Sequence, residues 1–224
     1  TNNQSLWADH AEKFALYEVK IAIQLMDKYY ENKEKDDFYR IAKQSFKKWS
    51  GQLDRYLIDK ISTDDQPEFY KQILSKLTSR TKDIRRYKEL RQMLTKDEKE
   101  KFIKDNTYPK TFYIKLLEEE DRYNEILRYV KNNTDSYDFA QIIRPVLNVH
   151  PKECFDIIKT KTDATLLESR GRSIYQAIVR WLMEMKKIKG FEKESVKYFA
   201  ELYNMQPRLP ALRDEFKKAD LYSG

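Results

Sequence analysis

Residues 174–185 of the chain are IYQAIVRWLMEM, and this stretch decides the class of fold. Its apolar side chains recur at positions i, i+3, i+4, i+7, i+8 and i+11, which is the spacing of one face of an α-helix. They are Ile174, Ala177, Ile178, Trp181, Leu182 and Met185. Gly190 follows as a helix-stop signal. The pattern predicts an amphipathic helix that ends at Gly190 and carries Trp181 into a hydrophobic core.

Helical spacing continues on both sides of this stretch. Beyond residue 107, helices are predicted to begin near residues 109, 121, 137, 151, 173, 192 and 209, with Pro109, Pro151 and Pro210 at three of these starts. Pro145 is predicted to kink the helix around residues 139–147, and a polar stretch over residues 159–172 separates two helices. Successive helix pairs therefore occupy about 28–36 residues each, which is the length of a helical-repeat unit.

The first hundred residues show the same periodicity. A first long helix, which Ser5 caps, is predicted from four apolar residues at helical spacing. These four are Phe14, Tyr17, Ile21 and Leu25. A second apolar pattern covers residues 38–61 and is interrupted at Gly51. Another helix begins near Pro67. Thr95 and Glu98, which follows it by three residues, predict a capping box.

The composition supports helices rather than sheets. Only four glycines and six prolines occur in 224 residues, and 36% of the residues are charged. A β-sandwich or barrel would need a turn signal every ~8–12 residues, whereas narrow apolar stripes beside wide charged faces are typical of packed helices. We therefore predict an all-α fold in which paired antiparallel helices stack as an irregular α-solenoid, similar to TPR or HEAT repeats, without a sheet. An irregular helical bundle is the alternative.

Residues 1–106 are assigned to an N-terminal helical region and residues 107–224 to a C-terminal helical-repeat region, as two domains or as one continuous domain. The chain has no apolar signal segment at its start and no run of ~18 apolar residues, so we expect no membrane association and a cytoplasmic location.

Few side chains are suited to catalysis or metal binding. With two histidines and one cysteine, a zinc site built from four Cys and His ligands cannot form. His150 and Cys154 lie four residues apart, and we interpret them as a helix entrance and a member of an apolar stripe rather than as base and nucleophile. The acidic clusters at residues 36–37 and 118–121 are interpreted as helix caps and charge partners. We therefore expect no enzymatic activity, no cofactor, no metal and no small-molecule substrate.

The positive charge is concentrated in one segment. The net charge of the chain is +7, and between residues 76 and 104 eleven basic residues face five acidic ones. The segment over residues 80–104 is a candidate nucleic-acid contact, because lysines and arginines on a helix face bind phosphates. The candidate residues are Arg80, Lys82, Arg85, Arg86 and Lys88. The alternative is an ordinary solvated helix, in which Arg85 pairs with Glu89 and Tyr87 points inward.

Sixteen tyrosines and three tryptophans also suggest an interaction surface, since these residue types are enriched at binding hot spots. Most of them fit the apolar stripes described above. Tyr29, Tyr30 and Tyr198 are the candidates for exposed aromatic side chains.

Residues 120–222 resemble the C-terminal α-helical region of bacterial proteins that carry an N-terminal SWIM-type zinc finger. Four segments carry the resemblance: Arg172 to Ala177, Trp181 to Met185, Phe199 to Tyr203, and Arg208 to Phe216 with its Pro-Ala-Leu turn. The chain departs from the family in having Leu209 between Arg208 and Pro210, where the family has adjacent arginines.

The family's zinc finger needs a Cys-x-Cys pair and a later Cys-x-His, which a single cysteine cannot supply. The resemblance therefore implies that this chain is the C-terminal fragment of a longer protein. The finger would lie upstream of Thr1, together with the zinc and the DNA-binding or protein-binding role.

These observations favour a non-enzymatic helical-repeat scaffold that mediates protein–protein interaction with a partner that the sequence does not identify. The alternative is a nucleic-acid-associated helical module that uses the basic segment over residues 80–104.

Overall fold

The computed structural model describes residues 11–205 and 207–222, and within this part of the chain it contains helices and no β-strand. The predicted all-α class is therefore confirmed. The chain divides into two compact units, Thr1–Lys104 and Asp105–Gly224, which we call the N-terminal and C-terminal units.

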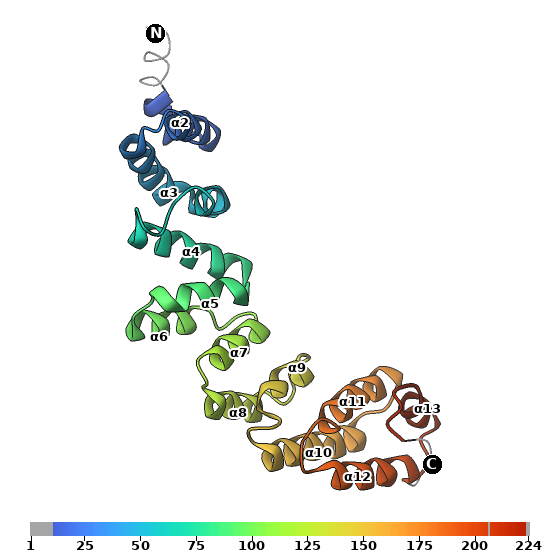
Figure 1. Ribbon diagram of the computed structural model, residues 1–224. Coiled ribbons are helices and arrows are strands. Elements are labelled where there is room, and N and C mark those ends of the chain that lie inside the picture. Colours follow the sequence, from blue (N-terminus) through green and yellow to red (C-terminus); the bar gives the residue numbers. More distant parts are fainter. Residues whose placement is uncertain (1–10, 206, 223–224) are drawn as a thin grey trace. The chain divides into compact units, whose positions relative to one another are not determined.

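In the N-terminal unit each helix packs mainly on its neighbours in sequence (Figure 1). The helices are α2 (Val19–Glu31), α3 (Lys35–Ile58), α4 (Pro67–Thr81), α5 (Ile84–Met93) and α6 (Lys96–Asp105), the last of which ends at the boundary of the unit. Helix α3 contacts both α2 and α4, and α4 contacts α5. Leu25, Leu53 and Leu74 are fully buried and belong to α2, α3 and α4, so the core runs from one helix to the next.

The first predicted long helix is in fact two helices. Residues 11–15 are helical, and the backbone N–H groups of Tyr17 and Glu18 both donate to the carbonyl oxygen of Phe14, which ends this turn before α2 begins. The break changes the helical phase, so Phe14 and Tyr17 are exposed, while Ala11 and Ala15 are buried. The expected Ser5 cap lies outside the described residues.

Helix α3 also differs from its prediction, because it continues through Gly51. Its irregularity lies two residues earlier, at Trp49, whose φ of −118° and ψ of 27° are not helical. The capping box that begins α6 is confirmed: the Thr95 N–H donates to Glu98 Oε2 (2.8 Å) and the Glu98 N–H donates to Thr95 Oγ1 (3.3 Å). Tyr87 points inward as predicted and stacks on Phe102, with ring centres 5.4 Å apart.

The C-terminal unit begins its helices within two residues of the predicted positions. They are α7 (Lys110–Glu119), α8 (Tyr123–Asn132), α9 (Phe139–Ile143), the 3₁₀ turn η1 (Arg144–Val146), α10 (Pro151–Glu168), α11 (Arg172–Met185), α12 (Glu192–Asn204) and α13 (Pro210–Lys218). Pro145 lies in η1, and the regular helix that it was expected to kink ends at Ile143. Pro151 and Pro210 each occupy the first helical position, where a missing N–H costs no hydrogen bond.

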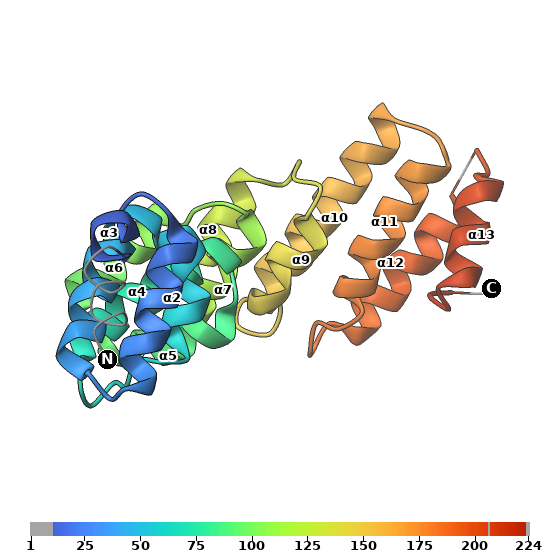
Figure 2. The ribbon, with the colours of Figure 1, turned by 90° about the horizontal axis from the view of Figure 1, so that it is seen from above.

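Helix α11, which contains the stretch IYQAIVRWLMEM, is central to this unit. It contacts α9, α10 and α13, and Figure 2 shows it lying alongside α10. Ile178, Leu182 and Met185 are fully buried and Trp181 is nearly so, which confirms the predicted face. Most other contacts in the unit join helices that are neighbours in sequence, such as α7 with α8 and α12 with α13.

Helix α10 is longer than the sequence pattern suggested. The polar stretch over residues 159–172 was expected to separate two helices, but α10 continues to Glu168. Thr162 and Leu166 are buried, so they extend the apolar stripe of Cys154 and Ile158 at four-residue spacing. The additional helical turns form one wall of the groove described next.

Candidate binding groove and basic surface

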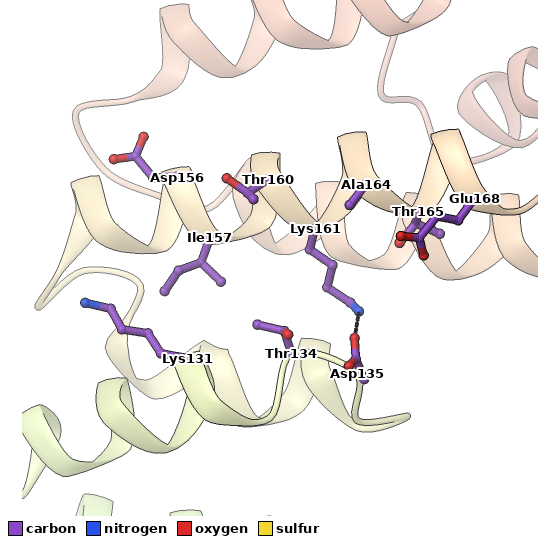
Figure 3. A pocket seen from close by; sticks show the side chains of 10 residues that line it. All are labelled: Lys131, Thr134, Asp135, Asp156, Ile157, Thr160, Lys161, Ala164, Thr165 and Glu168. Carbon is purple, nitrogen blue, oxygen red and sulfur yellow. Dashed lines mark ion pairs between the residues drawn. The ribbon is translucent and has the colours of Figure 1, made fainter.

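A groove with a volume of about 580 Å³ lies in the C-terminal unit between α10 and the end of α8 (Figure 3). Its lining consists of Lys131, Thr134, Asp135, Asp156, Ile157, Thr160, Lys161, Ala164, Thr165 and Glu168. Several of these side chains, including those of Lys131, Asp135 and Ala164, are exposed to solvent. The groove is therefore open at its edges, and its volume is in the range of typical ligand sites.

One face of α10 forms the first wall. Ile157, Lys161, Ala164 and Glu168 follow one another at i, i+4, i+7 and i+11, so they form a row along the helix. In Figure 3, Ile157 and Lys161 point from α10 toward α8, whereas Asp156 points away from the gap. The middle of this wall is thus apolar apart from one amine.

That amine, Lys161 Nζ, is held over two aromatic rings. It lies 4.3 Å from the ring centre of Trp181 and 5.3 Å from that of Phe139. Only 9% of the Lys161 side chain is exposed, and burial lowers the pKa of its amine, which Asp135 partly opposes. The stacking is a cation–π arrangement, which is stronger where water is excluded.

The carboxylate closest to Lys161 in the described residues is Asp135, in the turn that follows α8. The distance from Nζ to Oδ1 is 3.8 Å, which is too long for a hydrogen bond, and the Asp135 side chain is fully exposed. Two other ion pairs of the C-terminal unit are tighter: Arg144 reaches Glu184 at 2.6 Å and Lys159 reaches Asp163 at 3.0 Å. The two aromatic rings therefore compensate the charge of Lys161 in part, while its only nearby carboxylate in the described residues is weakly placed.

Sequence reasoning missed this groove because it treated residues 159–172 as a break between helices. The spacing of Ile158, Thr162 and Leu166 was the signal that could have extended α10. The position of Lys161 over Trp181 could not be read from the sequence, because it depends on how α10 and α11 pack.

The predicted basic segment is divided between two helices. Arg80 belongs to α4 and is held by the buried Asp54 of α3, with Nε–Oδ2 at 2.8 Å and Nη2–Oδ1 at 2.6 Å. Lys82 is the C-cap residue of α4, has a left-handed backbone (φ 54°) and is half-buried, and burial lowers its pKa. Neither residue belongs to α5, so the expectation that Lys82 shares one helix with Arg85 and Arg86 is wrong.

The remaining three candidates lie on α5. Arg85 and Lys88 are exposed and Arg86 is half-buried. Arg85 pairs with the N-cap residue Asp83 (3.0 Å) instead of the predicted Glu89, which accepts a hydrogen bond from Tyr70. The five predicted residues therefore do not act as one row, although Arg85 and Lys88 still present positive charge to solvent.

The aromatic candidates for the surface need two corrections. Tyr30 is half exposed, but Tyr29 and Tyr198 are buried. Their hydroxyl groups donate to the partly exposed carboxylates of Glu12 (2.5 Å) and Asp163 (2.6 Å), so the polar end of each ring has a hydrogen-bond partner. The aromatic side chain that is most exposed in the C-terminal unit is Tyr137, which the sequence did not single out.

A second hollow, of about 440 Å³, lies in the N-terminal unit between the α2–α3 turn and the loop before α4. Lys60 Nζ lies over the Tyr30 ring at 4.4 Å but also pairs with Asp27 at 2.9 Å, and Lys35 pairs with Asp65 at 2.9 Å. Its positive charges are therefore largely compensated within the chain.

His150 and Cys154 do not form a nucleophile–base pair. The Cys154 thiol donates to the backbone oxygen of Val146 (3.5 Å), and burial raises its pKa to about 12, which is opposite to the change in an activated cysteine. The acidic residues at 36–37 lie in the first turn of α3, as expected of helix-end charges.

Two further properties concern ligands and membranes. In the part of the chain that the structure describes, no three His, Cys, Asp or Glu side chains come together as a metal site would require. Across the same residues, no helix combines the length and apolar character that crossing a bilayer demands.

Comparison with known proteins gives no match to a family model, a curated protein or a solved structure.

Proposed function

We propose that this chain is a non-enzymatic helical scaffold that binds another protein, with the groove between α8 and α10 as its binding site. The observation that carries this proposal is the groove itself, in which Ile157 and Ala164 of α10 lie among polar and charged side chains. Interfaces between separately folded proteins are similarly mixed, with apolar contacts beside polar ones. The sequential packing of the helices supports an irregular α-solenoid, whose repeated surfaces suit this role.

A peptide library displayed on phage tests the proposal, with the immobilised chain as target. We expect the wild-type chain to enrich peptides that the Ala164→Trp variant does not retain, because an indole at this exposed position fills the groove. Val196→Trp is the matched control, since Val196 is exposed on α12 and does not line the groove. No enrichment, or equal retention by both tryptophan variants, would contradict the proposal.

Nucleic-acid binding is the second candidate, because Arg85 (86% exposed) and Lys88 are exposed basic residues on α5. Fluorescence anisotropy with labelled single-stranded and double-stranded DNA at low and high salt distinguishes nucleic-acid binding from protein binding in the groove. Micromolar binding that weakens steeply with salt, and that is lost in the combined Arg85→Glu and Arg86→Glu variant, would favour this candidate. Absence of DNA binding at low salt would exclude the nucleic-acid candidate.

A cytoplasmic location and the SWIM-associated role remain predictions.

A further inference from the structure

Lys161 is the feature of the groove that packing alone does not explain. A buried ammonium group loses its hydration, and a single exposed carboxylate 3.8 Å away compensates poorly for that loss. An apolar side chain of similar length would cover the rings of Phe139 and Trp181 without this cost. The position of the amine in a groove therefore indicates a role in binding.

The two rings and the groove determine which side of Lys161 is available. The amine lies over the rings of Trp181 and Phe139. Asp135 approaches it from the turn after α8 (Figure 3). Because Asp135 is exposed and held only at 3.8 Å, an incoming acceptor can replace it at little cost. The acceptor that fits a buried ammonium best is a carboxylate at hydrogen-bonding distance.

The other charges of the lining limit how acidic the occupant can be. Lys131 and Lys161 are opposed by Asp135, Asp156 and Glu168, so a run of acidic residues would be repelled. Asp156 points away from the gap, and Glu168 lies at the far end of the row. A peptide with a single carboxylate beside Lys161 keeps that charge away from both Asp156 and Glu168.

The row on α10 also sets the spacing of the occupant's apolar residues. Ile157 lies four residues before Lys161, and Ala164 lies three residues after it, which corresponds to about 6 Å and about 4.5 Å along the helix axis. In an extended peptide, side chains two residues apart point the same way and are about 6.6 Å apart. An apolar residue two positions before the acidic one therefore matches Ile157 closely, and one two positions after it extends about 2 Å beyond Ala164.

Resting on the proposed protein-binding function, we propose that the α8–α10 groove binds an extended peptide segment of the pattern apolar-x-acidic-x-apolar, whose carboxylate replaces Asp135 as the partner of Lys161. Asp135 then acts as an internal competitor that occupies the site weakly in the free protein. The apolar-x-acidic-x-apolar pattern defines the chemical character of the partner segment but not the identity of the partner protein.

Anisotropy titrations with a fluorescein-labelled capped heptapeptide test this assignment. The peptide has one glutamate placed two residues from a leucine on either side, with glycine and serine elsewhere, and a matched peptide has glutamine in place of glutamate. We expect the glutamate peptide to bind the full chain at least tenfold more tightly than the glutamine peptide. Lys161→Met should remove that preference, whereas Lys152→Met, at an exposed position of the same helix, should retain it.

Two additional readouts separate binding from a structural role of Lys161. Lys161→Met should raise the thermal midpoint of the chain, because it removes a poorly compensated buried charge. Asp135→Asn changes a fully exposed side chain and should tighten binding of the glutamate peptide severalfold, which keeps the proposal testable if Lys161→Met fails to fold.

The following results would overturn the assignment. They are equal binding of the two peptides, unchanged affinity in Asp135→Asn, displacement of the peptide by millimolar inorganic phosphate, or Lys161-dependent binding of single-stranded DNA. If the phage library yields groove-dependent peptides without the acidic residue, the proposed function stands and this inference fails. If the library yields no peptides, both fail.

Discussion

Asp54, Glu184 and Glu215 are buried carboxylates, and an arginine from another element holds each of them. Arg80 joins α4 to α3, Arg144 joins η1 to α11, and Arg172 joins α11 to α13. Each arginine keeps part of its side chain in solvent while its guanidinium group satisfies a carboxylate in the interior. These pairs fix the register of neighbouring helices, because the charged atoms must meet to compensate for lost hydration.

Arg80→Ala should destabilise the chain by about 2 kcal/mol or more, since it leaves the carboxylate of Asp54 buried without its main partner. Chemical denaturation followed by circular dichroism measures the effect. Arg85→Ala is the matched control, because Arg85 is exposed and its loss should cost less than about 0.5 kcal/mol. Equal losses of unfolding free energy in the two variants would show that the Arg80–Asp54 pair contributes no more to stability than an exposed pair.

The Glu184 pair predicts a dependence of stability on pH. Burial raises the pKa of Glu184, but the hydrogen bonds from Arg144 and Lys187 outweigh this and hold it below its ordinary value of 4.5. The pair therefore stabilises the fold above the unfolded-state pKa, and this contribution is lost as the pH falls through the lower, folded-state pKa.

We expect the wild type to exceed Glu184→Gln in free energy of unfolding near pH 7, and the difference to shrink between about pH 5 and pH 3. Urea denaturation of both proteins across this range measures it. A difference that stays constant with pH would mean that the charge of Glu184 does not contribute.

At the level of single residues, sequence periodicity predicted burial well for apolar side chains and poorly for tyrosines. Trp181 and Tyr87 are buried as predicted, because they continue stripes of aliphatic residues. Tyr29 and Tyr198 were placed at the surface because the sequence does not show that Glu12 and Asp163 come within reach of their hydroxyl groups.

At the level of elements, Gly51 and Gly190 are in contrasting situations. A Cβ atom at Gly51 would meet no atom within 4 Å, and the residue lies inside α3, whereas Gly190 has a φ of +81° after α11. Gly51→Ala should stabilise the chain by about 0.5–1 kcal/mol through helix propensity. Gly190→Ala should destabilise it by about 1 kcal/mol, since a side chain is strained at that φ. Thermal unfolding of both variants measures this, and shifts of the same sign would contradict it.

The helix starts of the C-terminal unit could be predicted from the sequence because local chemistry fixes them. Pro151 and Pro210 open α10 and α13 as expected, and Pro109 precedes α7 directly. The length of α10 could not be predicted in the same way, because tertiary packing buries Thr162 and Lys161, which are polar. The candidate groove depends on this extension, so it was missed together with the helix.

At the level of the whole molecule, each unit has its own buried core. The predicted boundary after residue 106 leads us to expect that residues 107–224, expressed alone, unfold cooperatively with the helical content of α7–α13. The core around α11 supplies the reason, since α9, α10 and α13 all pack on it. Circular dichroism and urea denaturation of the fragment test this. A fragment without a cooperative transition would show that the two regions form one continuous domain.

The amine of Lys161 lies 4.3 Å from the ring centre of Trp181, and this proximity gives the chain a built-in optical reporter. The excited state of an indole redistributes its electrons, so a positive charge at that distance shifts the colour of its emitted light. Any event that moves or neutralises the amine changes this emission. We therefore expect the proposed peptide to shift the emission of Trp181 without any label, most readably in a variant that keeps Trp181 as its single tryptophan of three.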